Sequence, residues 1–481
     1  MQYHSTRGTS PEVNSAQAVL QGLALDGGLY MPGAIPAFDW KACVASDTLE
    51  MAIQILSAFL PDVPEMGELV QKAYRGKFET EDLTPTVPVG DFSVLELFRG
   101  PTSAFKDVAL SMLPQLMTAA KTARGMDEDI LILTATSGDT GKAALEGFHD
   151  VPGIRICVFY PDGGVSQVQR RQMVSQVGEN VTVCAVRGNF DDCQTGVKNV
   201  FAACRDKVLP FKLSSANSIN IGRLAPQITY YFKAYRDLLD AGKIQMGDEV
   251  NFSVPTGNFG DILAGYLAKL LGLPVGMLIC ASNANNVLED FINTGTYDRR
   301  RPLHKTDSPS MDILVSSNLE RLLYLMSGDT ALVAGLMGQL NAEGSYTVPQ
   351  ALLEKIQSQF WGFHCDDHGA HESISSCWET HHYLMDTHTA AGWVAAQQYV
   401  EKTGDKRPMV VLSTASPYKF PKAVLSAVGG DTEGDEFALM ERLEELTGVP
   451  IPKNLANLRQ MPERHLGVIH KEEMLDFVLG L

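Results

Sequence analysis

Apolar segments of strand length alternate with segments of helical spacing in the middle of the chain, and this alternation limits the fold more than any other feature. Residues 129–136 (DILILTAT) are apolar and rich in β-branched side chains, and residues 142–148 follow them with helical spacing. Two further pairs repeat the order: 154–161 with 167–178, and 181–188 with 191–207. This spacing predicts a mostly parallel sheet covered by helices on both faces.

The same alternation starts again at residue 249. Residues 249–255 have strand character, 261–273 have helical spacing, and 273–282 again have strand character. A length of 481 residues is enough for about two to four domains. We therefore predict an α/β fold with two doubly wound, mostly parallel sheets.

The flanking regions have different patterns. About ninety helical residues precede the first sheet and end in the turn-rich segment 84–90, while the region from roughly 283 to 385 is irregular and is expected to decorate the second sheet. The last fifty residues, with helical spacing at 433–448, are expected to be helical and peripheral. The predicted division is an N-terminal helical domain (1–94), a catalytic core of two α/β domains (95–430, the smaller roughly 129–240) and a C-terminal helical extension (431–481).

Composition excludes several classes of protein. A net charge of −18 argues against a nucleic-acid partner, because binding to phosphate backbones requires clustered Lys and Arg. No run reaches the roughly 18 apolar residues of a membrane-spanning helix. The first ten residues lack the pattern of a signal peptide, and the eight cysteines form no C-x-x-C pair. These features favour a protein of the reducing cytoplasm.

Two glycine-rich turns each stand between a strand and a helix: TSGDTGK (136–142) and PTGNFGD (255–261). The free N–H groups and the positive dipole end of a helix's first turn bind anions, and glycine lets the backbone approach the ligand closely. Either turn alone is equally well explained as a tight connection. Neither matches a Walker loop or G-x-G-x-x-G. Two such turns in one chain therefore favour two small anionic groups, without ATP or NAD.

Lys106 follows Phe105 at the start of a predicted helix in the segment 95–112. A lysine at such a position is usually a solvated surface charge. The apolar neighbours favour a desolvated pocket instead, in which a lysine loses its proton more readily and can form a Schiff base with an aldehyde cofactor.

Five segments together resemble one family. FRGPTSAFKD, TSGDTG, NSINIGRLAPQ, PTGNFGDILAGYLAK and STASPYKFP occur in the order found in threonine synthases, and STRG (5–8) and VLQGLALDGGLYMP (19–32) resemble that family's N-terminal domain. The resemblance spans nearly the whole chain and is to the bacterial and fungal type, within the tryptophan-synthase-β-like fold. It implies a pyridoxal-phosphate enzyme, monomer or homodimer, that makes threonine from the small-molecule substrate O-phosphohomoserine.

The resemblance also implies roles for individual residues. Lys106 would carry the cofactor, Thr414 would hydrogen-bond its pyridine nitrogen, and Arg223 would bind the substrate phosphate. We expect Asp261 to cap the helix that follows it, away from the cofactor phosphate. The cofactor phosphate would lie against Gly257, Asn258, Phe259, Gly260 and Asp261. The substrate carboxylate would lie against Ser137, Asp139 and Thr140, and the substrate phosphate against Asn217, Ser218, Asn220 and Arg223.

Two positions depart from the family pattern. Thr387 stands in DTHTA where DPHTA is usual, and Ser416 stands in TASPYKF where TAHPAKF is usual. Both departures bear on how closely the site matches its substrate more than on the class of reaction. Three other functions stay open: a threonine-synthase-like phospholyase that releases 2-oxobutyrate, a related enzyme acting on serine or threonine, and a non-catalytic relative. The intact Lys106 argues against the last of these.

Histidines and cysteines gather between His364 and His388, which raises the question of a metal site. The spacing H-C-D-D-H-G-A-H matches no standard zinc pattern. A polar loop near the mouth of the active site is the preferred interpretation, and no metal is predicted.

Overall fold

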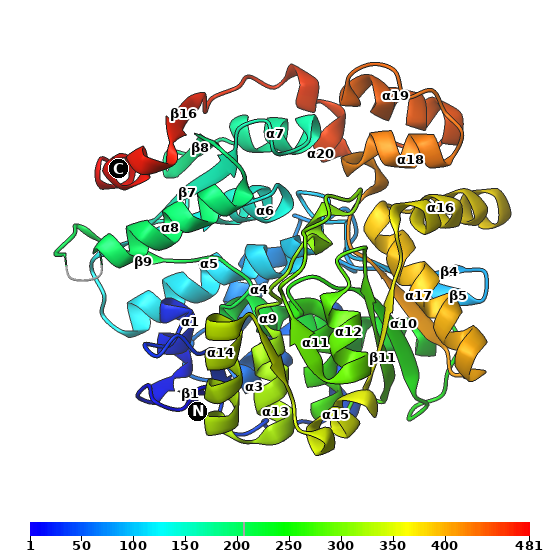
Figure 1. Ribbon diagram of the computed structural model, residues 1–481, viewed down its shortest axis with the longest axis horizontal. Helices are drawn as coiled ribbons and strands as arrows, with labels where there is room; N and C mark the ends of the chain where they lie inside the picture. Colours follow the sequence, from blue (N-terminus) through cyan, green and yellow to red (C-terminus); the bar gives the residue numbers. More distant parts are fainter. Residues whose placement is uncertain (205–206) are drawn as a thin grey trace.

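The computed structural model describes residues 1–204 and 207–481. Two sheets organise the chain, and Figure 1 shows the smaller one in the upper half of the molecule and the larger one in the lower half. Helix α5 (Lys106–Ala123) runs between the halves and packs against α6 (Asp139–Phe148) on one side and α1 (Ser15–Gln21) on the other. This arrangement confirms the predicted α/β class.

The smaller sheet has the strand order β16-β8-β7-β6-β9, and all its neighbouring strands are parallel. Parallel strands covered on both faces are apolar along their whole length, and the core residues of β6 and β7 accordingly are buried. The strands are β6 (Asp129–Ala135), β7 (Ile154–Pro161), β8 (Val181–Arg187), β9 (Phe211–Ser214) and β16 (Gly467–His470). Its helices are α6, α7 (Gln167–Val174), α8 (Phe190–Cys204) and α21 (Met474–Leu479). The predicted helix 191–207 extends over residues 205–206, which lie outside the described residues.

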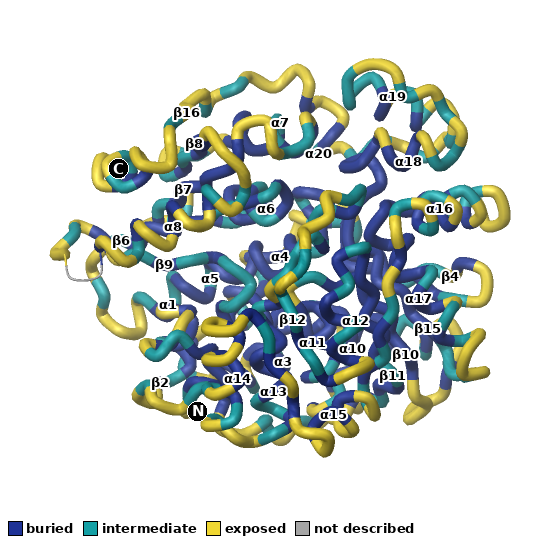
Figure 2. Tube along the Cα trace, in the orientation of Figure 1, coloured by how far each residue is buried: buried dark blue, intermediate teal, exposed yellow. Residues whose placement is uncertain are grey.

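The larger sheet has the order β14-β11-β10-β15-β5-β4, and every pair is parallel except β4 with β5. Figure 2 shows its central strands as buried. The strands are β4 (Thr86–Val89), β5 (Phe92–Glu96), β10 (Val250–Pro255), β11 (Val275–Ser282), β14 (Phe360–His364) and β15 (Met409–Ser413). Helices beside it include α10 (Ile228–Asp240), α11 (Gly260–Leu270), α12 (Val287–Thr294) and α17 (Thr387–Thr403). The segment 84–90 is therefore part of a hairpin in this sheet and more than a turn.

The N-terminal region combines helices with a small antiparallel sheet of order β2-β1-β3, where only helices were expected. The opening residues are polar, but Tyr3 is fully buried and donates a hydrogen bond to Phe59 O at 2.6 Å. Its strands are β1 (Gln2–Ser5), β2 (Val13–Asn14) and β3 (Tyr30–Pro32), and its helices are α1, α2 (Trp40–Val44), α3 (Thr48–Phe59) and α4 (Met66–Tyr74).

The expectation that 283–385 is irregular is wrong. This region supplies β14 to the edge of the larger sheet as well as several helices. These elements are short, and their pairing partners lie far away in sequence, so local pattern carries little signal for them. The further elements are β12 (Thr296–Asp298), α13 (Leu319–Ser327), α14 (Thr330–Glu343), β13 (Ser345–Thr347), α15 (Gln350–Gln357) and α16 (Asp367–His381).

The C-terminal residues are not purely helical, because β16 completes the smaller sheet beside β8. The helices before it are α18 (Pro421–Ala427), α19 (Glu436–Thr447) and α20 (Lys453–Ala456). The domain boundaries at 94 and 430 stay predictions, and β5 spans the first of them.

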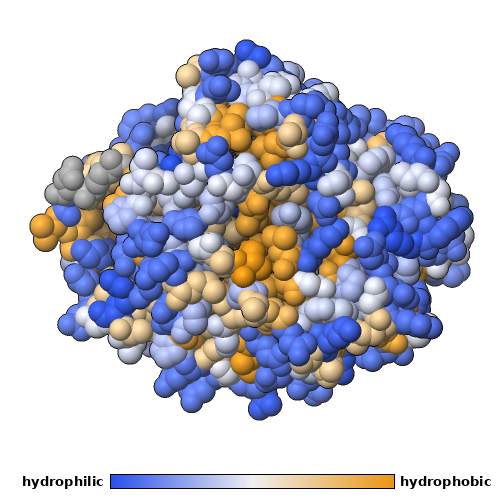
Figure 3. All heavy atoms as spheres, turned by 90° about the horizontal axis from the view of Figure 1, so that it is seen from below, coloured by the Kyte–Doolittle hydropathy of each residue, from blue (hydrophilic) through white to orange (hydrophobic). Residues whose placement is uncertain are grey.

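Among the described residues, no helix combines the length and apolar character needed to cross a membrane. Seen from below, the surface is mostly polar at its rim, with apolar side chains near its centre (Figure 3).

Candidate active site

Lys106 begins α5 and is 8% exposed. Its Nζ lies 4.6 Å from the centre of the Phe105 ring and 3.8 Å from Asp139 Oδ2. Burial disfavours the charged ammonium and lowers the pKa of Lys106 to about 8, although the Asp139 carboxylate acts in the opposite direction. The structure therefore places this lysine in a desolvated pocket, as expected from its apolar neighbours.

The turn TSGDTGK lies between β6 and α6. Thr136 Oγ1 accepts hydrogen bonds from the N–H groups of Gly138 at 3.0 Å and of Gly141 at 2.9 Å. Gly138 has a φ of +140°, a conformation that L side chains rarely adopt, so the turn requires glycine there. Ser137 and Thr140 are partly exposed, whereas the Asp139 carboxylate is buried against lysines. The start of α6 can bind an anion through backbone N–H groups and these two hydroxyls.

The turn PTGNFGD lies between β10 and α11 and is held by residues of the segment 308–318. Ser316 Oγ donates to Gly257 O at 2.7 Å, and Asn318 N–H donates to Asn258 O at 3.0 Å. A Cβ on Gly257 would lie 2.6 Å from the carbonyl oxygen of Ser310, so no larger residue fits. In the described part of the chain, no acceptor meets the N–H groups of Asn258 and Phe259. The turn therefore offers free N–H groups at a helix start, which fits a phosphate.

The expectation that Asp261 caps α11 is wrong. The helix begins at Gly260 after Phe259, and no side chain caps it. Asp261 lies inside the first turn, and its Oδ1 accepts hydrogen bonds from Tyr230 at 2.6 Å and Tyr231 at 3.0 Å. Burial raises the pKa of Asp261 to about 6, against the effect of the two tyrosine hydrogen bonds.

Thr414 follows β15 and lies beside the segment that leads into α5. Phe105 N–H donates to Thr414 O at 2.8 Å, and Ser416 N–H donates to Ser103 O at 3.1 Å. The Ser416 side chain accepts from the N–H of Tyr418 at 3.3 Å, so this departure from the family pattern starts the short helix Pro417–Lys419. The two segments bring Thr414 next to the start of α5, where Lys106 lies, although the two residues are far apart in the sequence.

Arg223 is a buried cation without a carboxylate partner among the described residues. It lies on α9 (Ile221–Leu224), is 3% exposed and donates from Nη1 to Ala216 O at 2.9 Å, while its Nε has no partner. Burial lowers the pKa of Arg223 to about 10. Its positive charge is one of the groups that lower the pKa of Lys106. An unpaired buried guanidinium calls for an anionic ligand.

The other predicted phosphate-binding residues of NSINIGR differ in how far their side chains are exposed to solvent. Asn220 is fully buried, donates to Val19 O at 2.8 Å and accepts from Gly222 N–H at 2.8 Å, so its side chain fixes the start of α9. Asn217 and Ser218 are partly exposed and remain accessible to a ligand.

Sequence reasoning missed one residue of this site. Lys419 is fully buried, and its Nζ lies 2.6 Å from Asp139 Oδ1. It stands between Tyr418 and Phe420 in STASPYKFP, so it has the aromatic neighbour that drew attention to Lys106. The same signal could have found it.

Three histidines of the region 364–388 pair with separate carboxylates. His364 Nδ1 lies 2.5 Å from Glu289, and His371 Nε2 lies 2.9 Å from Asp307. His388 Nδ1 lies 2.7 Å from Asp386 Oδ2, and its Nε2 accepts from Ser310 N–H at 3.1 Å. Their rings are therefore engaged in packing the loops together.

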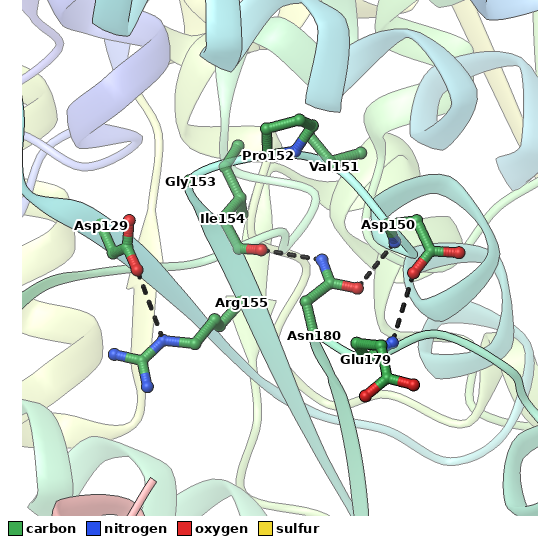
Figure 4. A pocket seen from close by; sticks show the side chains of 9 residues that line it. All are labelled: Asp129, Asp150, Val151, Pro152, Gly153, Ile154, Arg155, Glu179 and Asn180. Atoms are coloured by element: carbon green, nitrogen blue, oxygen red, sulfur yellow. Dashed lines mark hydrogen bonds and ion pairs between the residues drawn. The ribbon is translucent and has the colours of Figure 1, made fainter.

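A surface depression lies at the opposite end of the smaller sheet (Figure 4). It is lined by residues at the start of β6 and β7, whereas the turn TSGDTGK follows the end of β6. Asn180 fills part of it by donating to Ile154 O at 2.8 Å and accepting from Asp150 N–H at 2.7 Å. Its polar groups thus bond to one another, away from Lys106.

Comparison with known proteins assigns the family. The chain is 39% identical to the threonine synthase of Pseudomonas aeruginosa over 97% of its own length and 98% of that protein. The chain belongs to the threonine synthase family. Family models described as threonine synthase N terminus, pyridoxal-phosphate dependent enzyme, and threonine synthase C-terminal match residues 2–74, 81–415 and 389–474. This member of the threonine synthase family is therefore a pyridoxal-phosphate-dependent enzyme, and pyridoxal phosphate is its cofactor.

Solved structures agree with this assignment to the threonine synthase family. The pyridoxal-phosphate-bound threonine synthase of Brucella melitensis superposes with a TM-score of 0.88 at 40% identity, covering 100% of this chain and 98% of that one. The chain is also 39% identical to threonine synthase-like 1 of Homo sapiens, but spans 58% of that protein's length.

Proposed function

We propose that the protein converts O-phosphohomoserine and water into threonine and phosphate, with pyridoxal phosphate carried by Lys106. The observation that carries this proposal is Arg223, a buried guanidinium that has no carboxylate partner among the described residues and whose charge acts on Lys106. A substrate that brings its own phosphate supplies the missing anion. The names of the relatives, threonine synthases over nearly the full length, support the same reaction.

The cofactor would be held at both ends. Lys106 and Thr414 would contact its ring end, and the turn Gly257, Asn258, Phe259, Gly260 and Asp261 would hold its phosphate with backbone N–H groups at the start of α11. The close approach of Gly257 to Ser310 and the free N–H groups of the turn support this assignment. When bound, pyridoxal phosphate supplies an electron sink for the carbon next to the substrate's amino group.

The substrate would lie between α6 and α9. Ser137, Thr140 and the backbone of Asp139 would hold its carboxylate at the start of α6, while Asn217, Ser218 and Arg223 would hold its phosphate. Asn220 supports the second group by capping α9. This arrangement orients the phosphate as a leaving group on Cγ and leaves the amino group toward Lys106.

Lys106 would act as the general base. A pKa of about 8 leaves part of the amine unprotonated at neutral pH, so its Nζ can take the proton from Cα and return protons later. Asp139 lies 3.8 Å from that nitrogen and stabilises its protonated form. Burial of the pair keeps bulk water from the nitrogen. The water that the reaction consumes would add at Cβ.

The decisive experiment incubates the purified protein with O-phosphohomoserine and resolves the products by chromatography. Threonine and phosphate in equal amounts support the proposal. Formation of 2-oxobutyrate and phosphate would instead identify a phospholyase, which would use the same cofactor residues. The Lys106→Ala variant is the control for background hydrolysis.

We further propose that the enzyme acts in the cytoplasm as a monomer or homodimer. The eight cysteines are free and buried, which suits a reducing compartment. The net charge of −18 disfavours nucleic acid as a partner. Light scattering of the purified protein measures the oligomeric state.

A further inference from the structure

Two buried lysines share the carboxylate of Asp139. Lys419 Nζ lies 2.6 Å from Oδ1, and Lys106 Nζ lies 3.8 Å from Oδ2. Lys419 is fully buried, and Asp139 is 4% exposed. Water therefore screens these charges little, and the carboxylate compensates two cations in one desolvated cluster.

Asp139 is fixed so that one particular oxygen faces Lys106. Its Oδ1 accepts from Gln169 Nε2 at 2.9 Å in addition to its contact with Lys419, which leaves Oδ2 for Lys106. Lys419 also donates to Thr102 O at 3.1 Å, and Thr102 N–H donates to Asp107 Oδ2 at 2.9 Å. Lys419 is thus linked to Lys106 through Asp139. It is also linked through Thr102 to Asp107, the second residue of α5.

We propose that Lys419 is a positioning residue: it holds the Asp139 carboxylate toward Lys106, and its own charge lowers the proton affinity of Lys106 Nζ. The inference rests on Lys106 as the carrier of the cofactor, which is part of the function proposed above.

The charges around Lys106 give the direction of the effect. Asp139 favours a proton on Lys106, whereas the positive charge of Lys419 disfavours it. Loss of the Lys419 charge therefore raises the proton affinity of Lys106 Nζ. The charged groups that act on this nitrogen from the surrounding elements are Asp139, Lys419, Arg223, Asp107 and Asp261.

The test follows the visible absorption of the cofactor in the holoenzyme as the pH is varied. For Lys419→Met we expect the midpoint of the absorption change to rise by about one pH unit, a tenfold change in proton affinity. Lys419→Arg keeps the charge and should restore the midpoint. Asp139→Asn with Lys419→Met should give a midpoint below that of the parent, because Asp139 has the larger effect of the two.

Lys142→Met is the matched control. Lys142 also lies on α6 near Asp139, but it pairs with Glu146 at 2.9 Å, and its removal should leave the midpoint unchanged. A residue that merely braces the loops would lower thermal stability in Lys419→Met without moving the midpoint, and that result would overturn the proposal.

Folding and cofactor loading have their own readouts. Should Lys419→Met fail to fold, the double variant is compared with Asp139→Asn alone: a higher midpoint in the double variant supports an effect of Lys419, and equal midpoints overturn it. An absent cofactor band in the parent would overturn the cofactor assignment itself. A band whose midpoint is the same in every variant would overturn only the role of Lys419.

Discussion

At the scale of single residues, the chemistry depends on charged groups held out of water. Lys106, Arg223 and Lys419 are each at most 8% exposed, and one carboxylate, Asp139, lies between two of them. Burying cations costs free energy, and sites that bind anions commonly accept this cost. Each of these side chains can therefore be tested by a substitution with a defined chemical outcome.

Lys106 is the residue to which the cofactor should be attached. Reduction of the holoenzyme with borohydride, followed by peptide mapping, should find the reduced cofactor on Lys106, because its amine is the buried lysine with the pKa lowered to about 8. Attachment to Lys419 would show that the two lysines of the Asp139 cluster have the opposite roles.

Arg223 should bind the substrate phosphate and not the cofactor. A charge-assisted hydrogen bond is worth on the order of 1.5 to 3 kcal/mol, so Arg223→Ala should lower kcat/KM for O-phosphohomoserine roughly ten- to a hundred-fold. The visible absorption of the bound cofactor should barely change. A colourless variant that regains full activity with excess pyridoxal phosphate would mean that the two phosphate sites are assigned the wrong way round.

Asp261 should make stability depend on pH. Its pKa of about 6 in the folded protein exceeds the value of about 3.9 in an unfolded chain, so the folded state holds the proton longer and its stability falls as the pH rises from 4 to 6. Asp261→Asn lacks this loss. Relative to the parent, the variant should gain up to roughly 3 kcal/mol between pH 4 and 7. Thermal unfolding at several pH values measures the difference in free energy of unfolding between the variant and the parent. A difference that stays constant with pH would contradict a free-energy cost of ionising the buried Asp261 carboxyl.

Single residues also show what sequence can and cannot foresee. Lys106 is recognisable from its apolar neighbours and its motif, and the aromatic neighbours of Lys419 give a similar signal, but the pairing of Lys419 with Asp139 joins residues far apart in the sequence. Asp261 was expected to cap its helix, but Tyr230 and Tyr231 of another helix draw its side chain away. Such choices depend on neighbours that only the fold brings together.

At the scale of elements, the segment 304–318 connects the turn PTGNFGD to the start of α17. Ser316 and Asn318 hold carbonyl groups of that turn, while Asp307 and Ser310 are bonded to residues 387 and 388. The segment 304–318, called the strap below, therefore ties the turn PTGNFGD to the start of α17. Thr387, a departure from the family pattern, donates its hydroxyl to Asp307 O at 2.6 Å, a bond that proline cannot make.

Thr387→Val should loosen this strap with little change in shape. Loss of one buried hydroxyl bond costs about 1 kcal/mol, so the Kd for pyridoxal phosphate should rise about fivefold in equilibrium dialysis. Thr403→Val is the control, because it loses a similar bond, 2.7 Å to Tyr399 O, at the other end of the same helix. An equal effect of both substitutions would mean that the helix and not the strap is responsible.

The strap lies in the region 283–385 that was expected to be irregular. In the same region, β14 has the sequence FWGFH, too short to show a period, and becomes a strand through pairing with β11. By contrast, the bounds of β7 agree with the predicted 154–161, because a buried parallel strand is a continuous apolar run. Local pattern therefore predicted β6, β7, β8, β10 and β11, but not β5 and β15 inside the larger sheet or the edge strands of either sheet.

At the scale of the whole molecule, the last residues of the described chain complete the smaller sheet. β16 pairs with β8, and α21 packs against α8, so the segment 467–479 covers the edge and one face of the unit that carries the turn TSGDTGK. Met474 and Val478 of α21 are buried in the same apolar cluster as Phe159 of β7. These residues thus contribute to the stability of a unit whose other strands lie far earlier in the sequence.

Met474 provides the test of this contribution. Met474 is 1% exposed, and truncation of a large core side chain costs about 2 to 5 kcal/mol, so Met474→Ala should lower the free energy of unfolding by that amount. Leu479→Ala on the same helix is the control, because Leu479 is 39% exposed and surface changes are usually worth less than about 0.5 kcal/mol. Hydrogen exchange should locate the loss in β8 and α8, with β10 and α11 unchanged. A loss spread evenly over both sheets would mean that the two halves unfold as one cooperative unit, and that α21 stabilises the turn PTGNFGD as well as the turn TSGDTGK.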